Sequence, residues 1–166
     1  RVSWQLQPGC LLWFAWGVRA EILDSGIPWL VGARIVIDAP AAKVFALVAN
    51  PKMHPVIDGS KMVKGEMVGP EKLELGSIFW MKMHLGLPYL MKNKVVEFEQ
   101  DKLIAWMPLA RNIWRYEFKA LDAHCTEVTE WMDGRTAPKV LMKREVQWSP
   151  RAMAKSLVNL KKLAEQ

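Results

Sequence analysis

Cysteine and histidine are scarce in this sequence. The chain of 166 residues has two cysteines, Cys10 and Cys125, which lie far apart. They provide neither a disulfide framework nor the paired spacing of a structural zinc site. The three histidines, His54, His84 and His124, lack the short spacing typical of metal ligands on a helix. Glycine-rich phosphate loops are also missing, so we expect no metal site and no cofactor.

The apolar run at residues 10–18 (CLLWFAWGV) is only about half as long as a membrane-spanning helix. A signal peptide would need a basic start and a small-residue cleavage site, and Arg1 followed by nearby tryptophans fits this poorly. We expect residues 1–30 to be an N-terminal extension of uncertain structure and residues 31–166 to be one domain. We also expect the protein to be cytoplasmic.

Acidic residues are in the minority, with 17 aspartates and glutamates against 23 lysines and arginines. The excess gathers between positions 139 and 162, where only Glu145 opposes seven basic residues, namely Lys139, Lys143, Arg144, Arg151, Lys155, Lys161 and Lys162. No zinc-finger, RNP or basic-zipper pattern is present, so we expect no nucleic acid partner. A basic helix face is most often solvated, but it also suits an acidic partner or an anionic membrane surface.

Large apolar side chains are plentiful, including nine tryptophans and ten methionines. Two interpretations remain open. These side chains can fill a bulky, adaptable core, or they can line a cavity for an apolar ligand.

Alternating apolar and β-branched residues predict a series of strands. The expected strands are residues 33–38, 61–68, 76–85, 89–99, 103–109, 112–121 and 125–132. Short turns, such as the one at Gly86-Leu87-Pro88, separate most of them. Successive strands with short connections predict an antiparallel meander.

Helices are expected before and after this meander. A short helix begins at Pro40 and ends at Asn50, a second short turn or helix covers residues 51–54, and residues 55–60 are expected to be a loop. Ser149-Pro150 predicts the start of a long C-terminal helix, because serine can cap it and proline suits its first position. Its apolar stripe comprises Met153, Leu157, Leu160 and Ala164. Residues 138–145 are expected to add a helical turn before it.

The element order resembles the START-like helix-grip superfamily. The resemblance rests on residues 35–51 (IVIDAPAAKVFALVANP), on the paired segments 95–99 and 103–106, and on residues 126–130 (TEVTE). Within that superfamily the chain is similar to the SRPBCC group of polyketide cyclase/dehydrase and lipid-transport proteins. The resemblance implies an α+β fold, in which a curved antiparallel sheet of about seven strands wraps around the C-terminal helix. It implies a cavity between the sheet and that helix, but no shared catalytic set.

The inner face of such a sheet would line the cavity. We expect ligand contacts from Phe79, Met81, Met83, Asn93, Trp114, Phe118, Met153 and Leu157, although plain core packing is an equally good account of the apolar ones. His54 is a further candidate ligand-binding residue, because His54 and Asp58 would lie near the cavity mouth, in a position to gate or anchor a ligand. A solvated histidine and a loop-capping aspartate are the simpler explanation.

Glu130 and Tyr116 are the candidate catalytic residues. A carboxyl group in an apolar pocket has a raised pKa and can act as a general acid or base, while a tyrosine hydroxyl can donate to a ligand carbonyl. A simple ion pair of Glu130 with a lysine or arginine is the alternative.

Three functions follow from these observations. The favoured one is the binding of an apolar small molecule or lipid without chemical change. The second is a metal-free cyclase or dehydratase that uses Glu130 and Tyr116. The third is a non-catalytic interaction protein whose basic face, including Lys155, Lys161 and Lys162, meets an acidic lipid or protein.

Overall fold

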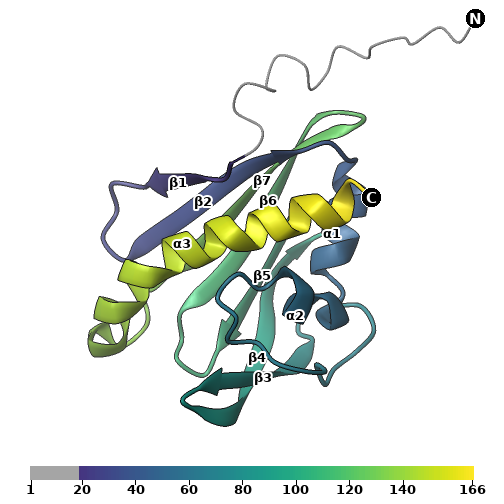
Figure 1. Ribbon diagram of the computed structural model, residues 1–166. Helices are drawn as coiled ribbons and strands as arrows, with labels where there is room; N and C mark the ends of the chain where they lie inside the picture. Colours follow the sequence, from purple (N-terminus) through teal and green to yellow (C-terminus); the bar gives the residue numbers. More distant parts are fainter. Residues whose placement is uncertain (1–18) are drawn as a thin grey trace, which may run out of the picture.

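The structure, a computed structural model, describes residues 19–166 as one antiparallel sheet with three helices and a 3-10 turn. The strands are β1 (Glu21–Asp24), β2 (Leu30–Ile37), β3 (Ile78–Leu85), β4 (Leu87–Glu99), β5 (Leu103–Pro108), β6 (Ile113–Asp122) and β7 (Cys125–Asp133). The helical segments are α1 (Ala41–Val48), the 3-10 turn Pro51–Met53, α2 (His54–Ile57) and α3 (Lys139–Ala164). The strand order is β1-β2-β7-β6-β5-β4-β3 (Figure 1). This is the α+β helix-grip fold that the sequence predicts.

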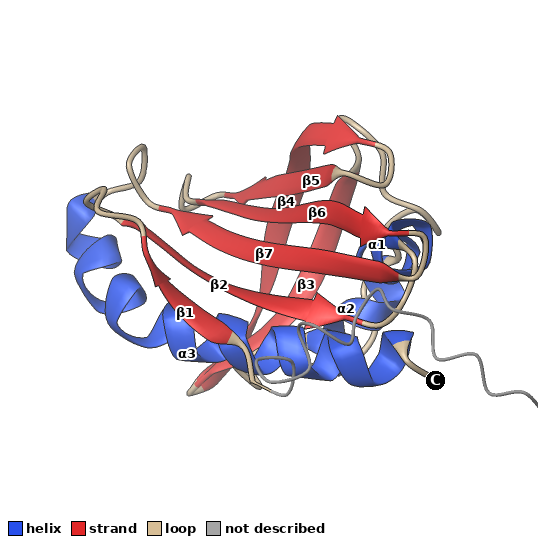
Figure 2. Ribbon diagram, turned by 90° about the horizontal axis from the view of Figure 1, so that it is seen from above, coloured by secondary structure: helices blue, strands red, loops and turns tan. Residues whose placement is uncertain are grey.

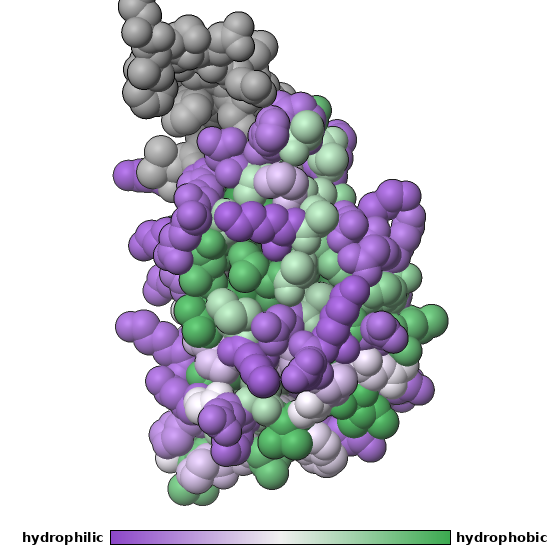
Figure 3. All heavy atoms as spheres, turned by 90° about the vertical axis from the view of Figure 1, so that its right-hand side faces the viewer, coloured by the Kyte–Doolittle hydropathy of each residue, from purple (hydrophilic) through white to green (hydrophobic). Residues whose placement is uncertain are grey.

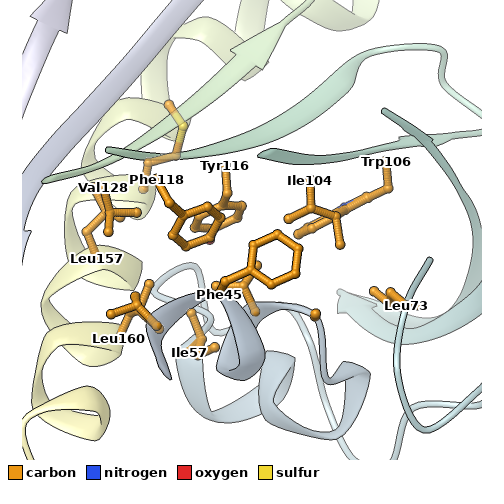
Figure 4. Packing of buried hydrophobic residues seen from close by; sticks show 14 of the residues in the cluster. Phe45, Ile57, Leu73, Ile104, Trp106, Tyr116, Phe118, Val128, Leu157 and Leu160 are labelled. Carbon is orange, nitrogen blue, oxygen red and sulfur yellow. The ribbon is translucent and has the colours of Figure 1, made fainter. Parts of the chain in front are cut away.

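Helix α3 lies along one part of the inner face of the sheet, against β2 and, to a smaller extent, β1 and β7 (Figure 2). Leu157 and Leu160 of α3 are fully buried and face Val128 of β7 (Figure 4). Phe45 of α1 packs edge-on against Phe118 of β6. The long helix and the short helices therefore share the inner face.

The strands form because their apolar residues alternate, so that one face can be buried and the other solvated. On β7 the inner face carries Thr126, Val128, Glu130 and Met132, all of which are buried. On the opposite face Arg115 of β6 forms an ion pair with Glu97 of β4, with an Nη2–Oε1 distance of 2.5 Å. A register shift between Val95 and Glu97 interrupts the β4–β5 ladder, and such bulges increase the local twist of a sheet.

Helix α3 begins well before the predicted start. Pro138 precedes its first turn, and Ser149 and Pro150 lie inside the helix. The prediction from the Ser-Pro pair was therefore wrong: Ser149 caps nothing, and its hydroxyl is buried without a partner among the described residues. Burial of Met142 extends the apolar stripe towards the N-terminus, and this packing outweighs the hydrogen bond that proline removes from a helix interior.

Three other predicted segments differ from the structure. Residues 61–68 are not a strand and make only the isolated bridges Val63–Met83 and Val68–Trp80. Lys61 and Gly65 have positive φ angles of 62° and 72°, which lie outside the extended region of backbone conformation. The expected loop at residues 55–60 contributes to α2. Strand β1 lies in the predicted N-terminal extension and pairs with β2.

The apolar run at residues 10–18 and Cys10 lie outside the described residues. In residues 19–166, no helix combines the length and the apolar character needed to cross a membrane. On the face of the molecule shown in Figure 3, hydrophilic side chains are interspersed with apolar patches.

Candidate functional site

Glu130 and Tyr116 form the centre of the candidate site. They are direct partners in the β6–β7 ladder, so both side chains point to the inner face, where each is 4% exposed. Burial raises the pKa of Glu130 to about 8, against the opposing effect of a hydrogen-bonding interaction with the Tyr116 hydroxyl. Burial also raises the pKa of Tyr116 well above its ordinary value, and the Glu130 charge adds to this effect. At neutral pH the pair is therefore largely protonated and uncharged.

Asp58 is a further acidic residue whose charge acts on this pair. Its charge contributes to the raised pKa of Glu130 and of Tyr116, so its carboxylate lies close enough to act on both. The loop that follows α2 fixes its orientation: Oδ1 accepts from the Ser60 amide and hydroxyl, and Oδ2 accepts from the Val63 amide. Asp58 therefore has the loop-capping role that was its simpler explanation, and it also acts on the interior.

His54 is buried and not the solvated loop residue of the simpler explanation. Its Nε2 lies 2.7 Å from the Val48 carbonyl oxygen, which can only accept, so Nε2 carries the proton. Burial is the main cause that lowers the pKa of His54 to about 4, and the ring is neutral at pH 7. Its Nδ1 is then an acceptor, and it has no partner among the described residues.

Stacked rings connect His54 to the Glu130–Tyr116 pair. Trp106 of β5 stacks on His54 with ring centroids 5.0 Å apart and on Tyr116 with centroids 5.7 Å apart. Phe79 meets both His54 and Trp106 edge-on. Figure 4 shows Trp106 and Tyr116 projecting from the sheet towards α1. Two polar groups with unpartnered atoms, Glu130 and His54, are thus embedded in an aromatic wall.

The other predicted contact residues also lie on the inner face. Phe79, Met153 and Leu157 are fully buried in the hydrophobic core, and Met81 and Phe118 are nearly so. Met83 and Trp114 are half-buried and pack against that core. Asn93 is 2% exposed, and its side-chain amide donates to the Met91 carbonyl at 3.0 Å. Trp106 was not among the predicted contact residues, although it lies opposite Trp114, which was.

The basic C-terminal face is only partly available to a partner. Lys161 pairs with Glu165 on the next turn, and its ammonium group also donates to the Val36 carbonyl at 2.9 Å. Lys155 and Lys162 remain exposed. Among residues 19–166, no group of three or more histidine, cysteine, aspartate or glutamate side chains is placed to hold a metal ion.

Comparison with known proteins gives the fold but no function. No family model matches the chain. It is 39% identical over 121 residues to Uncharacterized protein Rv0088 of Mycobacterium tuberculosis H37Rv, a match that covers 72% of this chain and 54% of that protein. The chain thus spans about half the length of the curated relatives that it matches, which include a 38% identical protein from strain CDC 1551.

Solved structures share the architecture at low sequence identity. The Zhui aromatase/cyclase from Streptomyces sp. R1128 superposes with a TM-score of 0.63 at 15% identity, covering 82% of this chain and 93% of that one. A protein from Arthrobacter aurescens gives a TM-score of 0.67 at 10% identity, covering 87% of this chain and 91% of that one. The protein therefore has a helix-grip fold, as these structures do.

Proposed function

We propose that this protein binds an apolar small molecule or lipid between the sheet and its helices, with a carbonyl or hydroxyl group of the ligand next to Glu130 and His54. The observation that carries the proposal is the pair of buried, unpartnered atoms, Glu130 Oε2 and His54 Nδ1, within an aromatic wall. A buried polar atom without a partner costs about 1–3 kcal/mol. A ligand that satisfies such atoms gains that energy back and adds apolar contact with the rings.

The protonation states define the ligand chemistry. Protonated Glu130 donates one hydrogen bond, and the Nδ1 lone pair of His54 accepts one. A ligand with a carbonyl near one end and a hydroxyl nearby would suit both groups. A charged ligand would not, since the site is neutral and buried.

Native mass spectrometry of the purified protein tests this proposal. We expect a co-purified apolar ligand that is retained by the wild type and reduced in the Glu130→Leu variant. The matched control is Glu117→Leu, because Glu117 lies on the same sheet with its side chain exposed. A preparation that is always empty, and that takes up no ligand from a panel of aromatic ketones and fatty alcohols, would contradict the proposal.

A second candidate function is acid–base catalysis, as in a cyclase or dehydratase. The observation that favours it is the Glu130 pKa of about 8 beside a tyrosine hydroxyl. Ionised Glu130 would take a proton from the carbon next to a ligand carbonyl, and Tyr116 would donate a hydrogen bond to the resulting enolate oxygen. In a dehydration, Glu130 would then return that proton to the departing hydroxyl group, which leaves as water.

Deuterium exchange can detect the first of these steps before the natural substrate is known. Acetophenone in deuterated buffer is a suitable probe, with exchange at its methyl group followed by NMR. We expect exchange to rise with pH towards about 8 and to be lost in Glu130→Gln, because only the ionised carboxylate is a base. Exchange at the same rate in wild type and in Glu130→Gln would assign it to solvent and reject the catalytic role.

A further inference from the structure

A pocket lies on α3 beside the loop that follows α2, and neither Glu130 nor Tyr116 lines it. Its volume is about 450 Å³, which lies within the usual range for small-molecule sites. Arg144, Trp148, Arg151 and Lys155 of α3 line it, together with Gly59 and Ser60 of the loop. The four α3 residues follow one another at intervals of four, three and four positions, so they share one face of the helix.

The positive charge of this pocket is not neutralised within the described residues. Arg144, Arg151 and Lys155 form none of the ion pairs found in residues 19–166, whereas Lys161 on the same helix has its glutamate. Asp58 precedes the lining loop but forms none of these ion pairs, and its carboxylate oxygens accept from Ser60 and Val63. Three unpaired cationic side chains around one hollow favour an anionic ligand.

Close packing holds the loop against the helix. The Gly59 amide donates to the Ser156 hydroxyl at 2.9 Å. A Cβ atom at position 59 would lie 2.4 Å from the Ala152 carbonyl oxygen and 2.5 Å from the Lys155 Cβ, so only glycine fits. The pocket is therefore built into the packing between the loop and α3.

We propose that this pocket binds a phosphomonoester. Arg144 and Arg151 would hold the phosphate, since the guanidinium fork matches phosphate oxygens and is always charged. Lys155 adds a third positive charge, and the half-buried Trp148 ring offers a surface for the organic part of the ligand. The phosphate can belong to a soluble metabolite or to a lipid headgroup, and both present the same chemistry to the pocket.

Isothermal titration calorimetry with phenyl phosphate tests the soluble form of the ligand. We expect the wild type to bind and the Arg144→Gln/Arg151→Gln variant to bind at least about tenfold more weakly, because charge-assisted hydrogen bonds are lost. The Lys143→Gln/Lys162→Gln variant is the matched control, since both lysines are exposed on α3 and neither lines the pocket. It removes the same charge and should change the Kd by no more than about twofold.

Vesicles of phosphatidylcholine with phosphatidic acid test the lipid form. Binding to phenyl phosphate that is lost in the pocket variant supports a soluble ligand. Binding only to these vesicles, again lost in the pocket variant and kept in the control, supports a lipid headgroup. Absence of both bindings, or an equal loss in the two double variants, would overturn the proposal. The exposed arginines are not core residues, so urea unfolding should give similar midpoints for all three proteins.

Discussion

Tyr116 of β6 and Glu130 of β7 are directly paired across the sheet, and both side chains are buried on its inner face. Burial keeps the Glu130 carboxyl group protonated near neutral pH, because it raises the pKa to about 8 against the opposing effect of Tyr116. A protonated carboxyl group and a phenol are neutral donors, which an apolar interior can hold at much lower cost than ions.

Glu130→Gln should remove a pH-dependent loss of stability. The folded state binds the Glu130 proton more tightly than the unfolded state, so the wild type loses stability as pH rises from 4.5 to about 8. Glutamine cannot ionise, so the variant should be more stable than the wild type above pH 8. Near pH 4 the two proteins should differ less in their free energy of unfolding. Urea unfolding across this range measures the effect, and the exposed Glu117→Gln should reproduce the wild-type profile. A wild-type profile in Glu130→Gln would contradict the raised pKa.

His54→Gln should change how stability depends on pH on the acidic side of neutrality. The pKa of His54 is lowered from 6.5 to about 4, so stability is lost as pH falls through this window while the unfolded state takes up the proton. The variant should be less stable at neutral pH, since it breaks the packing on Trp106, but flatter between pH 6.5 and 4. Exposed His124→Gln is the control and should keep the wild-type slope. An unchanged slope in His54→Gln would show that this ring does not titrate as described.

Leu157→Ala tests whether the α3 stripe is packed core. Leu157 is fully buried, so truncation should lower the free energy of unfolding by about 2–5 kcal/mol. Leu141→Ala, on the same helix but 51% exposed, should change it by no more than about 0.5 kcal/mol. A small effect at Leu157 accompanied by altered ligand binding would indicate that this side chain lines an open space instead.

Gly59→Ala should separate the loop from α3. The added Cβ meets backbone and Cβ atoms of α3 at 2.4–2.5 Å, and overpacking of this kind costs about 1–3 kcal/mol. Gly26→Ala is a useful comparison, since its Cβ would meet nothing within 4 Å and only its positive φ of 66° is unfavourable. Amide exchange of the Gly59–Ser156 hydrogen bond should accelerate in the variant. Full protection in Gly59→Ala would show that the loop can adapt.

The strands were predictable because their signal is local. Alternation within residues 112–121 sets which side chains share a face, and the structure places Tyr116 and Phe118 inside as expected. The segment 61–68 has similar residue types but fails as a strand, because Gly65 and Lys61 adopt left-handed backbone and only two isolated bridges form. Residue type alone does not supply a continuous pairing partner.

The start of α3 could not be predicted from its capping signal. Ser149-Pro150 is a good helix start in isolation, but the face that packs on β2 buries residues on both sides of it, including Met142. Tertiary packing therefore decided where the helix begins. The same packing divides the basic residues of α3 into two groups. Lys161 forms an ion pair with Glu165, whereas Arg144 and Arg151 line a pocket together with Gly59 of the loop.

The sequence by itself determined most of the helices and strands, their order and the inward face of the predicted strands that formed, because periodicity is a property of neighbouring residues. It also identified Glu130 and Tyr116 as unusual polar residues for that face. Only the tertiary structure decided that the two are opposite one another, that Asp58 acts on both, and that His54 is buried with one nitrogen unpartnered. These features depend on strand register and on loop contacts between distant parts of the chain, and burial then sets the pKa values.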